Sequence, residues 1–311
     1  MKRVFTFWSL AVFSATWLLF GGCSVQETIL RAAFVGGGEF ASPSGQPAEA
    51  FVQHTERVYS FRRNFYRTLI VDTDAGVVVI DPMNPELARA ARKIIDEKLG
   101  KPVHTLIYSH YHLDHVRGGK QLDPGAVIAH ERCDFYWKHF GTRHVLPPTA
   151  RISGDTVLDI GGVRIEAHYH GLSHTDTLFS FYLPDEKLVY APDLGFIDSF
   201  GTPGPFNTFY YGYKRAMERV VKLPFEHFIP SHGKVGNHKD FENALAFYVD
   251  VREITAEAVK VHGYGETREE MATLFDAIYP RLKEKYGHLH GFDQMVLPNI
   301  VRHMAGESLG Y

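Results

Sequence analysis

The feature that most constrains this 311-residue chain is a run of histidines and acids directly after an apolar stretch. Val103–Tyr108 has the composition of a strand buried on both faces, and Ser109-His110-Tyr111-His112-Leu113-Asp114-His115 follows it. Sheets of α/β proteins place their functional sites at the carboxyl ends of such strands. Three imidazoles and a carboxylate crowded at a buried strand end require a partner that offsets their desolvation. A divalent cation meets that need, because imidazole suits zinc and carboxylate oxygen completes its coordination.

The spacing within this run also favours a shared ligand. His110 and His112 are two residues apart in an extended segment, so both side chains can project to one side. Asp114 and His115 begin the next helix, before Gly118-Gly119. The alternative interpretation is a polar, solvated loop whose histidines bind nothing.

The run resembles the His-x-His-x-Asp-His signature of the metallo-β-lactamase superfamily. Three later segments match the remaining family positions in the same order: Gly171–Thr177 with His174, Val189–Asp193 with Asp193, and Phe228–Gly233 with His232. The resemblance covers residues 58–240, and it implies an α+β fold, a four-layer αββα sandwich with two mixed sheets inside and helices outside.

The resemblance also implies how the ligands divide between two metal ions. One ion would be held by His110, His112 and His174. The other would be held by Asp114, His115 and His232, with Asp193 bridging both. The implied cofactors are two Zn²⁺ ions per chain, with iron or manganese as alternatives. A hydroxide shared by the two ions would be the nucleophile.

Two acids have further implied roles. Asp114 would orient the hydroxide and pass its proton onward as the catalytic residue. Asp81 ends the apolar run Val77–Ile80 and resembles the family carboxylate that steadies a ligand histidine from behind. The alternative for Asp81 is a cap on the turn at Pro82.

Substrate contacts are predicted on loops and aromatic segments near these ligands. The candidates are Asn64, Tyr66, His144, Phe196, Tyr210, Tyr211 and Tyr213. One of the last three tyrosines would donate to an oxyanion, although the sequence leaves open which one points inward. Core packing is the alternative for each aromatic residue, and a surface or core role is favoured for His168 and His170.

The leading functional prediction is a dinuclear zinc-dependent hydrolase that cleaves an ester, lactone or thioester of a small organic molecule. Asp193 as the bridge resembles the glyoxalase II and lactonase branches rather than the dedicated lactam-cleaving ones. β-Lactam hydrolysis, phosphate or sulfate ester cleavage, and an iron-dependent oxidoreductase of the sulfur dioxygenase type are the alternatives. A metal-stabilised binding protein without turnover is a further alternative.

The first residues have the features of an export signal. Lys2 and Arg3 precede the apolar stretch Val4–Phe20, and Leu19-Phe20-Gly21-Gly22-Cys23 resembles a lipoprotein signal with Cys23 as the lipidation site. A plainly cleaved signal and an uncleaved anchor are the alternatives. The predicted location is the periplasm or cell envelope, with membrane contact only through the lipid.

Composition limits the partners. The formal charge is −3 and the chain lacks a basic run, which argues against nucleic acid and leaves a small-molecule substrate. Cys133 would be the remaining thiol after lipidation, and it is expected to be a buried apolar side chain. The sequence does not indicate an oligomeric state.

Four segments are predicted along the chain: a signal (1–22), a Gly/Pro-rich tether (23–56), the catalytic domain (57–240) and a helical extension (241–311). Periodicity predicts strands near residues 64–73, 77–80, 103–108, 127–129, 156–160, 163–167, 178–183, 188–190 and 227–230. Helices are expected at 85–99, 130–137, 210–223 and from Asp240 onward, with a break at Gly263-Tyr264-Gly265 and an N-cap at Thr267.

Overall fold

The computed structural model describes residues 48–140, 144–200 and 208–309. The predicted signal, Cys23 and most of the predicted tether lie outside these residues. The chain divides into two compact units. The larger contains both sheets, and the smaller contains the helical region from Val251 onward.

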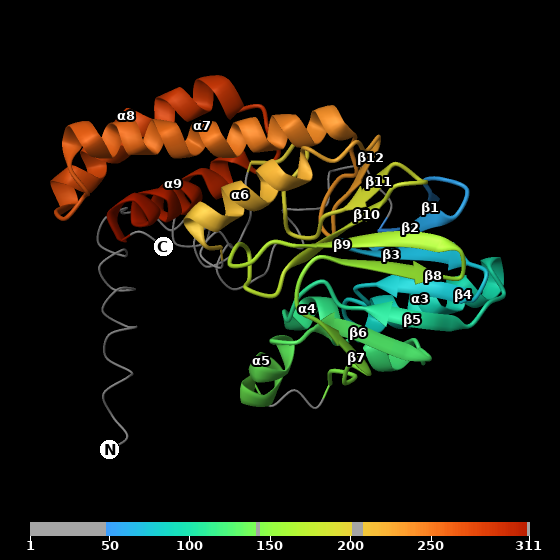
Figure 1. Cartoon of the computed structure of the whole chain (residues 1–311). Coiled ribbons are helices and arrows are strands. Elements are labelled where there is room, and N and C mark those ends of the chain that lie inside the picture. Colours follow the sequence, from blue (N-terminus) through green and yellow to red (C-terminus); the bar gives the residue numbers. More distant parts are fainter. Residues whose placement is uncertain (1–47, 141–143, 201–207, 310–311) are drawn as a thin grey trace, which may run out of the picture. The chain divides into compact units, whose positions relative to one another are not determined.

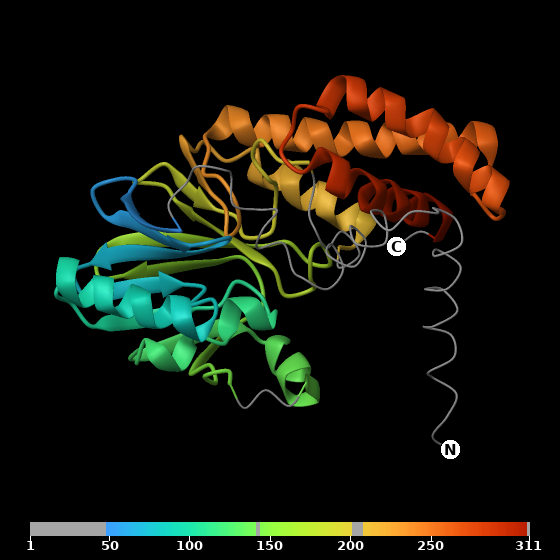
Figure 2. The ribbon, with the colours of Figure 1, turned by 180° about the vertical axis from the view of Figure 1, so that it is seen from behind.

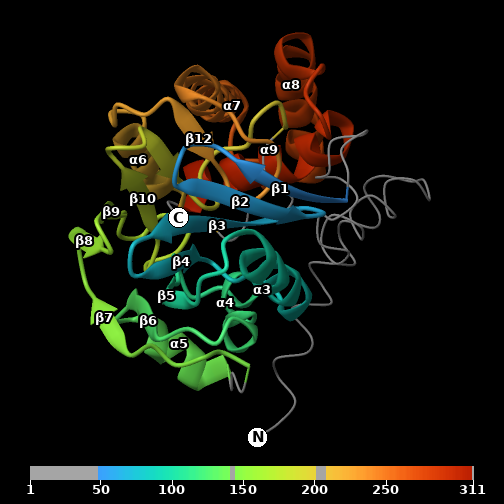
Figure 3. The ribbon, with the colours of Figure 1, turned by 90° about the vertical axis from the view of Figure 1, so that its right-hand side faces the viewer.

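A seven-stranded mixed sheet forms the first half of the larger unit. Its strands are β1 (Glu49–Gln53), β2 (Val58–Arg63), β3 (Tyr66–Thr73), β4 (Gly76–Ile80), β5 (Val103–Ile107), β6 (Ala126–His130) and β7 (Ala150–Ile152), and they lie in sequence order. The first four pair antiparallel, and β4 to β7 pair parallel. Figure 3 shows this order from β1 to β7.

A five-stranded sheet forms the second half, in the order β12-β11-β10-β9-β8. The strands are β8 (Thr156–Ile160), β9 (Val163–Tyr169), β10 (Phe179–Leu183), β11 (Leu188–Tyr190) and β12 (His227–Ile229). β8 to β11 are antiparallel, whereas β12 runs parallel to β11. The carboxyl ends of β11 and β12 therefore meet at one edge of the sheet, directly before Asp193 and His232.

Helices cover the outer faces of both sheets. They are α3 (Pro85–Lys98), α4 (Leu113–Val116), the 3-10 turn η1 (Gly119–Gln121), α5 (Cys133–Phe140), α6 (Tyr210–Val220) and the part of α7 (His238–His262) that precedes Val251. The amide of Leu87 donates to the side chain of Asn84, which caps α3 and fixes its start at Pro85. Figures 1 and 2 show α3 on one side of the paired sheets and α6 on the other.

Alternation along β4 shows how the layers are separated. Val77 and Val79 pack with Leu87 of α3 in one buried cluster, whereas Val78 and Ile80 point into the cluster between the two sheets. A third cluster packs the five-stranded sheet against α6 and the first turns of α7, with Phe228, Met217 and Phe241 as members. Three buried clusters between four layers confirm the predicted αββα sandwich.

The smaller unit contains the end of α7, α8 (Arg268–Tyr286) and α9 (Phe292–Leu309). Thr267 and Glu270 form the predicted capping box at the start of α8. Phe200 belongs to this unit and packs edge-on against Phe292, with ring centroids 4.7 Å apart. None of the helices within the described ranges combines the length and the apolar character that crossing a membrane requires.

Some elements differ from the prediction. Residues 49–53 lie within the predicted tether, but they form the strand β1, because all five residues pair with β2. β1 and β7 carry few buried side chains, so as edge strands they give a weak apolar signal. β2 was also missed, although most of its residues are buried. α7 runs through residue 240, the predicted end of the catalytic domain, as a continuous helix.

Candidate metal centre

The His110–His115 run lies where β5 ends and α4 begins. The amide of Tyr108 continues the β5–β6 pairing by donating to Ile128, and His112 is the residue that precedes α4. His110 and His115 are buried, and His112 and Asp114 are half-buried. The change from strand to helix within this short run brings these side chains to one edge of the seven-stranded sheet.

The other three residues come from separate loops of the five-stranded sheet. His174 lies between β9 and β10, Asp193 follows β11, and His232 follows β12. Hydrogen bonds join the first of these loops and the start of β10 to the motif: the amide of Tyr111 donates to Thr177 Oγ1 at 3.2 Å, and the amide of Phe179 donates to the Ser109 carbonyl at 2.9 Å.

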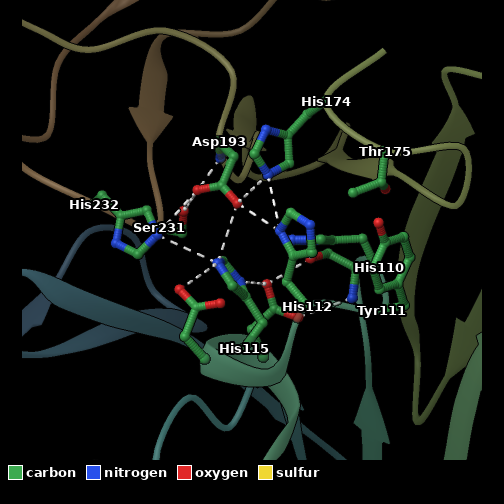
Figure 4. Close-up of polar contacts among 12 residues, drawn as sticks. His110, Tyr111, His112, His115, His174, Thr175, Asp193, Ser231 and His232 are labelled. Carbon is green, nitrogen blue, oxygen red and sulfur yellow. Dashed lines mark hydrogen bonds and ion pairs between the residues drawn. The ribbon is translucent and has the colours of Figure 1, made fainter. Parts of the chain in front are cut away.

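The carboxylate of Asp193 lies at the centre of the cluster, as Figure 4 shows. Its Oδ2 is 3.3 Å from His110 Nε2, 3.1 Å from His115 Nε2 and 3.2 Å from His174 Nε2. Its Oδ1 is 3.0 Å from His232 Nε2. One side chain therefore contacts histidines from both sheets.

The side chains form two groups, each with its donor atoms within 4.8 Å of one another: His110, His112, His174 and Asp193, and then Asp114, His115 and His232. His174 Nε2 faces His112 Nδ1 at 3.1 Å, and His115 Nε2 faces His232 Nε2 at 3.2 Å. Zinc–nitrogen bonds of about 2.0–2.1 Å at tetrahedral angles place neighbouring donors about 3.3 Å apart. The observed separations therefore fit ligands around a common cation.

Hydrogen bonds fix which nitrogen of His110 faces the centre. Ser109 Oγ donates to Asp81 Oδ2 at 2.7 Å, so its lone pairs accept from His110 Nδ1 at 2.9 Å. This leaves the lone pair of His110 Nε2 directed inward, and that buried atom has no hydrogen-bond partner in the structure. A bound cation would satisfy it.

The electrostatics of the cluster favour neutral His110 and His112 and an ionised Asp193, whereas Asp193 and Asp114 outweigh burial and hold the pKa of His115 well above its usual value. Burial, reinforced by His174, lowers the pKa of His112 to about 3, and burial together with His115 holds the pKa of His110 well below its usual value. Burial alone would raise the pKa of Asp193, but His115, His232 and His174 hold it well below the usual range. Neutral nitrogen and ionised oxygen are the forms that bind divalent metals.

Asp81 lies directly behind the motif. It accepts from the amide of Ser109 at 2.8 Å, and its Oδ2 lies 3.0 Å from His115 Nδ1 and 3.3 Å from the donating hydroxyl of Tyr190. Its contact with His115 is the one expected of a carboxylate that steadies a ligand histidine. Asp81 and Asp193 both follow strands and both adopt left-handed backbone, with φ of 58° and 56°. This backbone conformation is unfavourable for residues other than glycine, so surrounding contacts must hold it in place. Such residues are typical of functional sites.

Sequence reasoning missed several residues that hold these ligands. Ser231 Oγ donates to Asp193 Oδ1 at 2.9 Å and accepts from the Asp193 amide at 3.2 Å. Phe65 stacks on the ring of His232, with centroids 4.3 Å apart and planes 14° apart. The position of Ser231 beside a ligand was a usable signal, as it was for Ser109. Phe65 had no comparable signal.

The predicted substrate contacts lie in different environments. Asn64 and His144 are exposed, and Phe196 is half-buried. Tyr66 is half-buried and lies edge-on to His232, with centroids 5.2 Å apart.

The three tyrosines predicted as candidates for oxyanion contact also lie in different environments. Tyr210 is buried in the core, and Tyr211 is 43% exposed. Tyr213 differs from the prediction, because its buried hydroxyl donates to the Asp193 carbonyl at 2.8 Å and accepts from the Gly195 amide at 3.2 Å. Its hydroxyl is therefore engaged with the turn that carries Asp193.

Two close approaches position the surrounding elements. A Cβ on Gly212 of α6 would lie 1.7 Å from the Leu172 carbonyl, so the helix packs directly against the loop that carries His174. A Cβ on Gly119 would lie 2.4 Å from the Tyr108 hydroxyl, which keeps the segment after α4 close to β5. Only glycine permits these contacts.

Comparison with known proteins agrees with this geometry. The model of the metallo-beta-lactamase superfamily matches residues 66–232, more than half of the chain, and the protein belongs to this superfamily. Members of the superfamily are mostly metal-dependent hydrolases, and the His/Asp cluster suits a divalent cation.

Relatives of known sequence include the alpha and beta subunits of a 2,4-dinitroanisole O-demethylase from Nocardioides sp. (strain JS1661). The alpha subunit is 26% identical over 260 residues, which covers 82% of this chain and 78% of the subunit. The beta subunit is 25% identical over 250 residues, covering 79% and 77%. A metallo-beta-lactamase type 2 from Bacillus cereus is 25% identical over 175 residues, covering 54% of this chain and 67% of the relative.

Solved structures share the fold. A metallo-beta-lactamase from Pontibacter korlensis matches with a TM-score of 0.57 at 20% identity, covering 65% of this chain and 99% of the other. A double mutant of the sec-alkyl sulfatase PisA1 matches with a TM-score of 0.66 at 16% identity, covering 91% of this chain and 52% of the sulfatase chain.

Proposed function

We propose that this protein is a hydrolase that uses two divalent cations, with zinc as the first candidate, to cleave a small organic substrate. The observation that carries the proposal is the Asp193 carboxylate, which lies within 3.3 Å of histidine nitrogens from both donor groups. A carboxylate in that position can bridge two cations. His110, His112 and His174 would hold one cation, and Asp114, His115 and His232 the other.

Bound cations would supply Lewis acidity, which lowers the pKa of a water molecule and polarises a substrate oxygen. Asp114 is the residue we assign to proton transfer. Burial raises its pKa, but His115 and His232 outweigh burial and keep it below the usual value, so the carboxylate is ionised and accepts a proton. Its side chain is 41% exposed, which leaves it open to water and substrate.

We assign an ester, lactone or thioester as the leading substrate class. The bridging position of Asp193 supports this class, because it resembles the glyoxalase II and lactonase branches of the superfamily. Tyr66 and Tyr211 support a substrate with an apolar part, since both rings are partly exposed on segments that adjoin the ligand loops.

An activated aryl methyl ether is the second candidate substrate. Two relatives that align with about four fifths of the chain are named as subunits of a 2,4-dinitroanisole O-demethylase. A β-lactam is a third candidate, supported by the Bacillus cereus relative. An iron-dependent oxidoreductase is the alternative chemistry, and the metal content of the purified protein separates it from the hydrolase.

We also propose that the protein is exported and anchored through Cys23. The observation behind this is the positive, apolar and small-residue order of residues 1–23. Mass spectrometry of the native protein tests it, because a lipidated Cys23 adds acyl mass that extraction into detergent would reveal. A mature N-terminus elsewhere would contradict the anchor.

The deciding experiment is a substrate panel with purified protein, loaded with zinc or stripped by chelator. The panel contains an aryl ester, a γ-lactone, a thioester, 2,4-dinitroanisole, a chromogenic β-lactam and an alkyl sulfate. We expect chelator-sensitive hydrolysis of an ester, lactone or thioester, and we expect Asp114→Asn to abolish it. Full activity in Asp114→Asn, or activity that resists complete metal removal, would overturn the proposal.

A further inference from the structure

Arg67 of β3 encloses the segment that carries His232. Its guanidinium donates from Nη1 to the Pro230 carbonyl at 3.0 Å and from Nη2 to the Gly233 carbonyl at 2.8 Å. Its own backbone amide donates to the Ser231 carbonyl at 2.7 Å. These three hydrogen bonds hold carbonyls on both sides of His232, and they join the two sheets at this point.

The charge of Arg67 makes this arrangement unusual. The residue is 4% exposed, and none of the described acids lies within ion-pair distance of its guanidinium. Burial lowers its pKa to about 10, so it stays cationic at neutral pH. Burying a cation without an acidic partner is costly. Replacing such a charged residue by an apolar side chain of similar volume often leaves folding stability unchanged or increases it. The cost is better explained by the two carbonyls that the guanidinium holds in place.

The contacts of Arg67 with backbone carbonyls lie beside the donor group that contains His232, not beside the group that contains His110. Pro230 and Gly233 flank Ser231 and His232, whose Nε2 faces His115 Nε2 at 3.2 Å. The hydroxyl of Tyr190 links β3 to Asp81, since its single proton is shared between the Arg67 carbonyl at 3.2 Å and Asp81 Oδ2 at 3.3 Å. His110, His112 and His174 receive no contact from the Arg67 side chain.

We propose that Arg67 is a positioning residue for the donor group of Asp114, His115 and His232, because its guanidinium holds the backbone on both sides of His232. The proposal rests on the metal centre described above. It assigns no contact between Arg67 and substrate. The planar fork of arginine is required, because the single ammonium of lysine cannot hold two carbonyls in the same fixed geometry.

The first test needs no metal. Hydrogen exchange of chelator-treated full-length protein is compared for the wild type, Arg67→Lys, Arg67→Met and the control Arg92→Lys. Arg92 also donates to a backbone carbonyl, that of Leu122 at 2.7 Å, but on the outer helix α3. We expect about tenfold faster exchange in peptides covering residues 228–236 for both Arg67 variants, with residues 103–108 unchanged. Exchange equal to wild type, or faster across the whole chain, would overturn the proposal.

The second test measures cobalt binding by the visible absorption of the protein-bound ion. In both Arg67 variants we expect one of two binding constants to weaken by about 10- to 100-fold, with the other changed less than about threefold. Arg92→Lys should bind like the wild type. Equal weakening of both constants, or none, would overturn the role of Arg67. A wild type that binds no cobalt would instead overturn the proposed function, and the hydrogen-exchange test of Arg67 would still apply.

Discussion

The two sheets contribute to the candidate metal centre in different ways. The seven-stranded sheet supplies four side chains from one short run after β5, namely His110, His112, Asp114 and His115. The five-stranded sheet supplies three side chains, and each comes from a separate loop: His174, Asp193 and His232. One contribution is set by local chain geometry, and the other depends on where three loops are held.

This difference is visible in the supporting contacts. Asp81 makes three of the contacts that support the first contribution, because it binds the Ser109 amide and hydroxyl and the ring of His115. The second needs an anchor for each loop: Ser231 and Tyr213 hold Asp193, and the Arg67 guanidinium holds the His232 segment. A ligand set built from separate loops therefore needs its own anchor for each loop.

The largest expected effect comes from Asp193, where the two contributions meet. Asp193→Asn removes the charge that faces four histidines, so we expect loss of at least one of two bound cations. Activity should fall roughly a thousand-fold, equivalent to about 4 kcal/mol of barrier. Metal analysis and turnover of the best panel substrate measure both effects. Asp198→Asn, an exposed acid after the same strand, is the control, and two cations retained in Asp193→Asn would contradict the bridging role.

Asp81→Asn tests the support of the first contribution. The amide cannot accept from all the donors that now converge on the carboxylate, so we expect metal affinity to fall about 10- to 100-fold. Competition with a chromophoric chelator measures the affinity. Asp96→Asn on the surface of α3 serves as the comparison, and an Asp81 variant with wild-type affinity would show that the turn alone orients the ligands.

Ser231→Ala tests one anchor of the second contribution and should have a smaller effect. It removes one hydrogen bond to the Asp193 carboxylate and one from its amide, while Tyr213 still holds the same turn. We expect a decrease in metal affinity of about threefold to tenfold, the amount that one net hydrogen bond of about 1 kcal/mol supports. A loss as large as that of Asp193→Asn would mean that the anchors do not act independently.

The smallest effect at neutral pH is expected at His170, a buried histidine of the five-stranded sheet outside the ligand set. Burial, with Arg219 nearby, lowers its pKa to about 3 from a usual 6.5, and its Nε2 bonds to Ser180 Oγ at 2.8 Å. The unfolded chain therefore takes up a proton first, and folding stability falls as pH decreases from 6.5 toward 3. Between pH 7 and 5, the loss of folding stability should be smaller in His170→Gln than in the wild type, by an amount on the order of 1–2 kcal/mol.

Urea unfolding at a series of pH values in chelator measures this slope without interference from bound metal. His104→Gln, at an exposed position of β5, is the matched control. If His170→Gln lost as much stability on acidification as the wild type, another group would be responsible for the pH dependence.

The sequence predicted the elements whose patterns are local. The apolar run of β4, the hairpin β8–β9 with its Gly161-Gly162 turn, and the capped helix α8 are all read from neighbouring residues. The edge strands β1 and β7 were missed, because a strand paired on one side and partly exposed carries little periodic signal.

The sequence by itself also determined which seven side chains could form a metal centre, because a motif with that spacing is specific and the later segments matched in order. Only the tertiary structure decided what holds them. Arg67 lies 163 residues before Pro230, and Tyr190 lies 109 residues after Asp81, yet each pair is joined by a hydrogen bond. Such contacts depend on strand pairing between distant segments and on the packing of two sheets, which spacing along the chain does not encode.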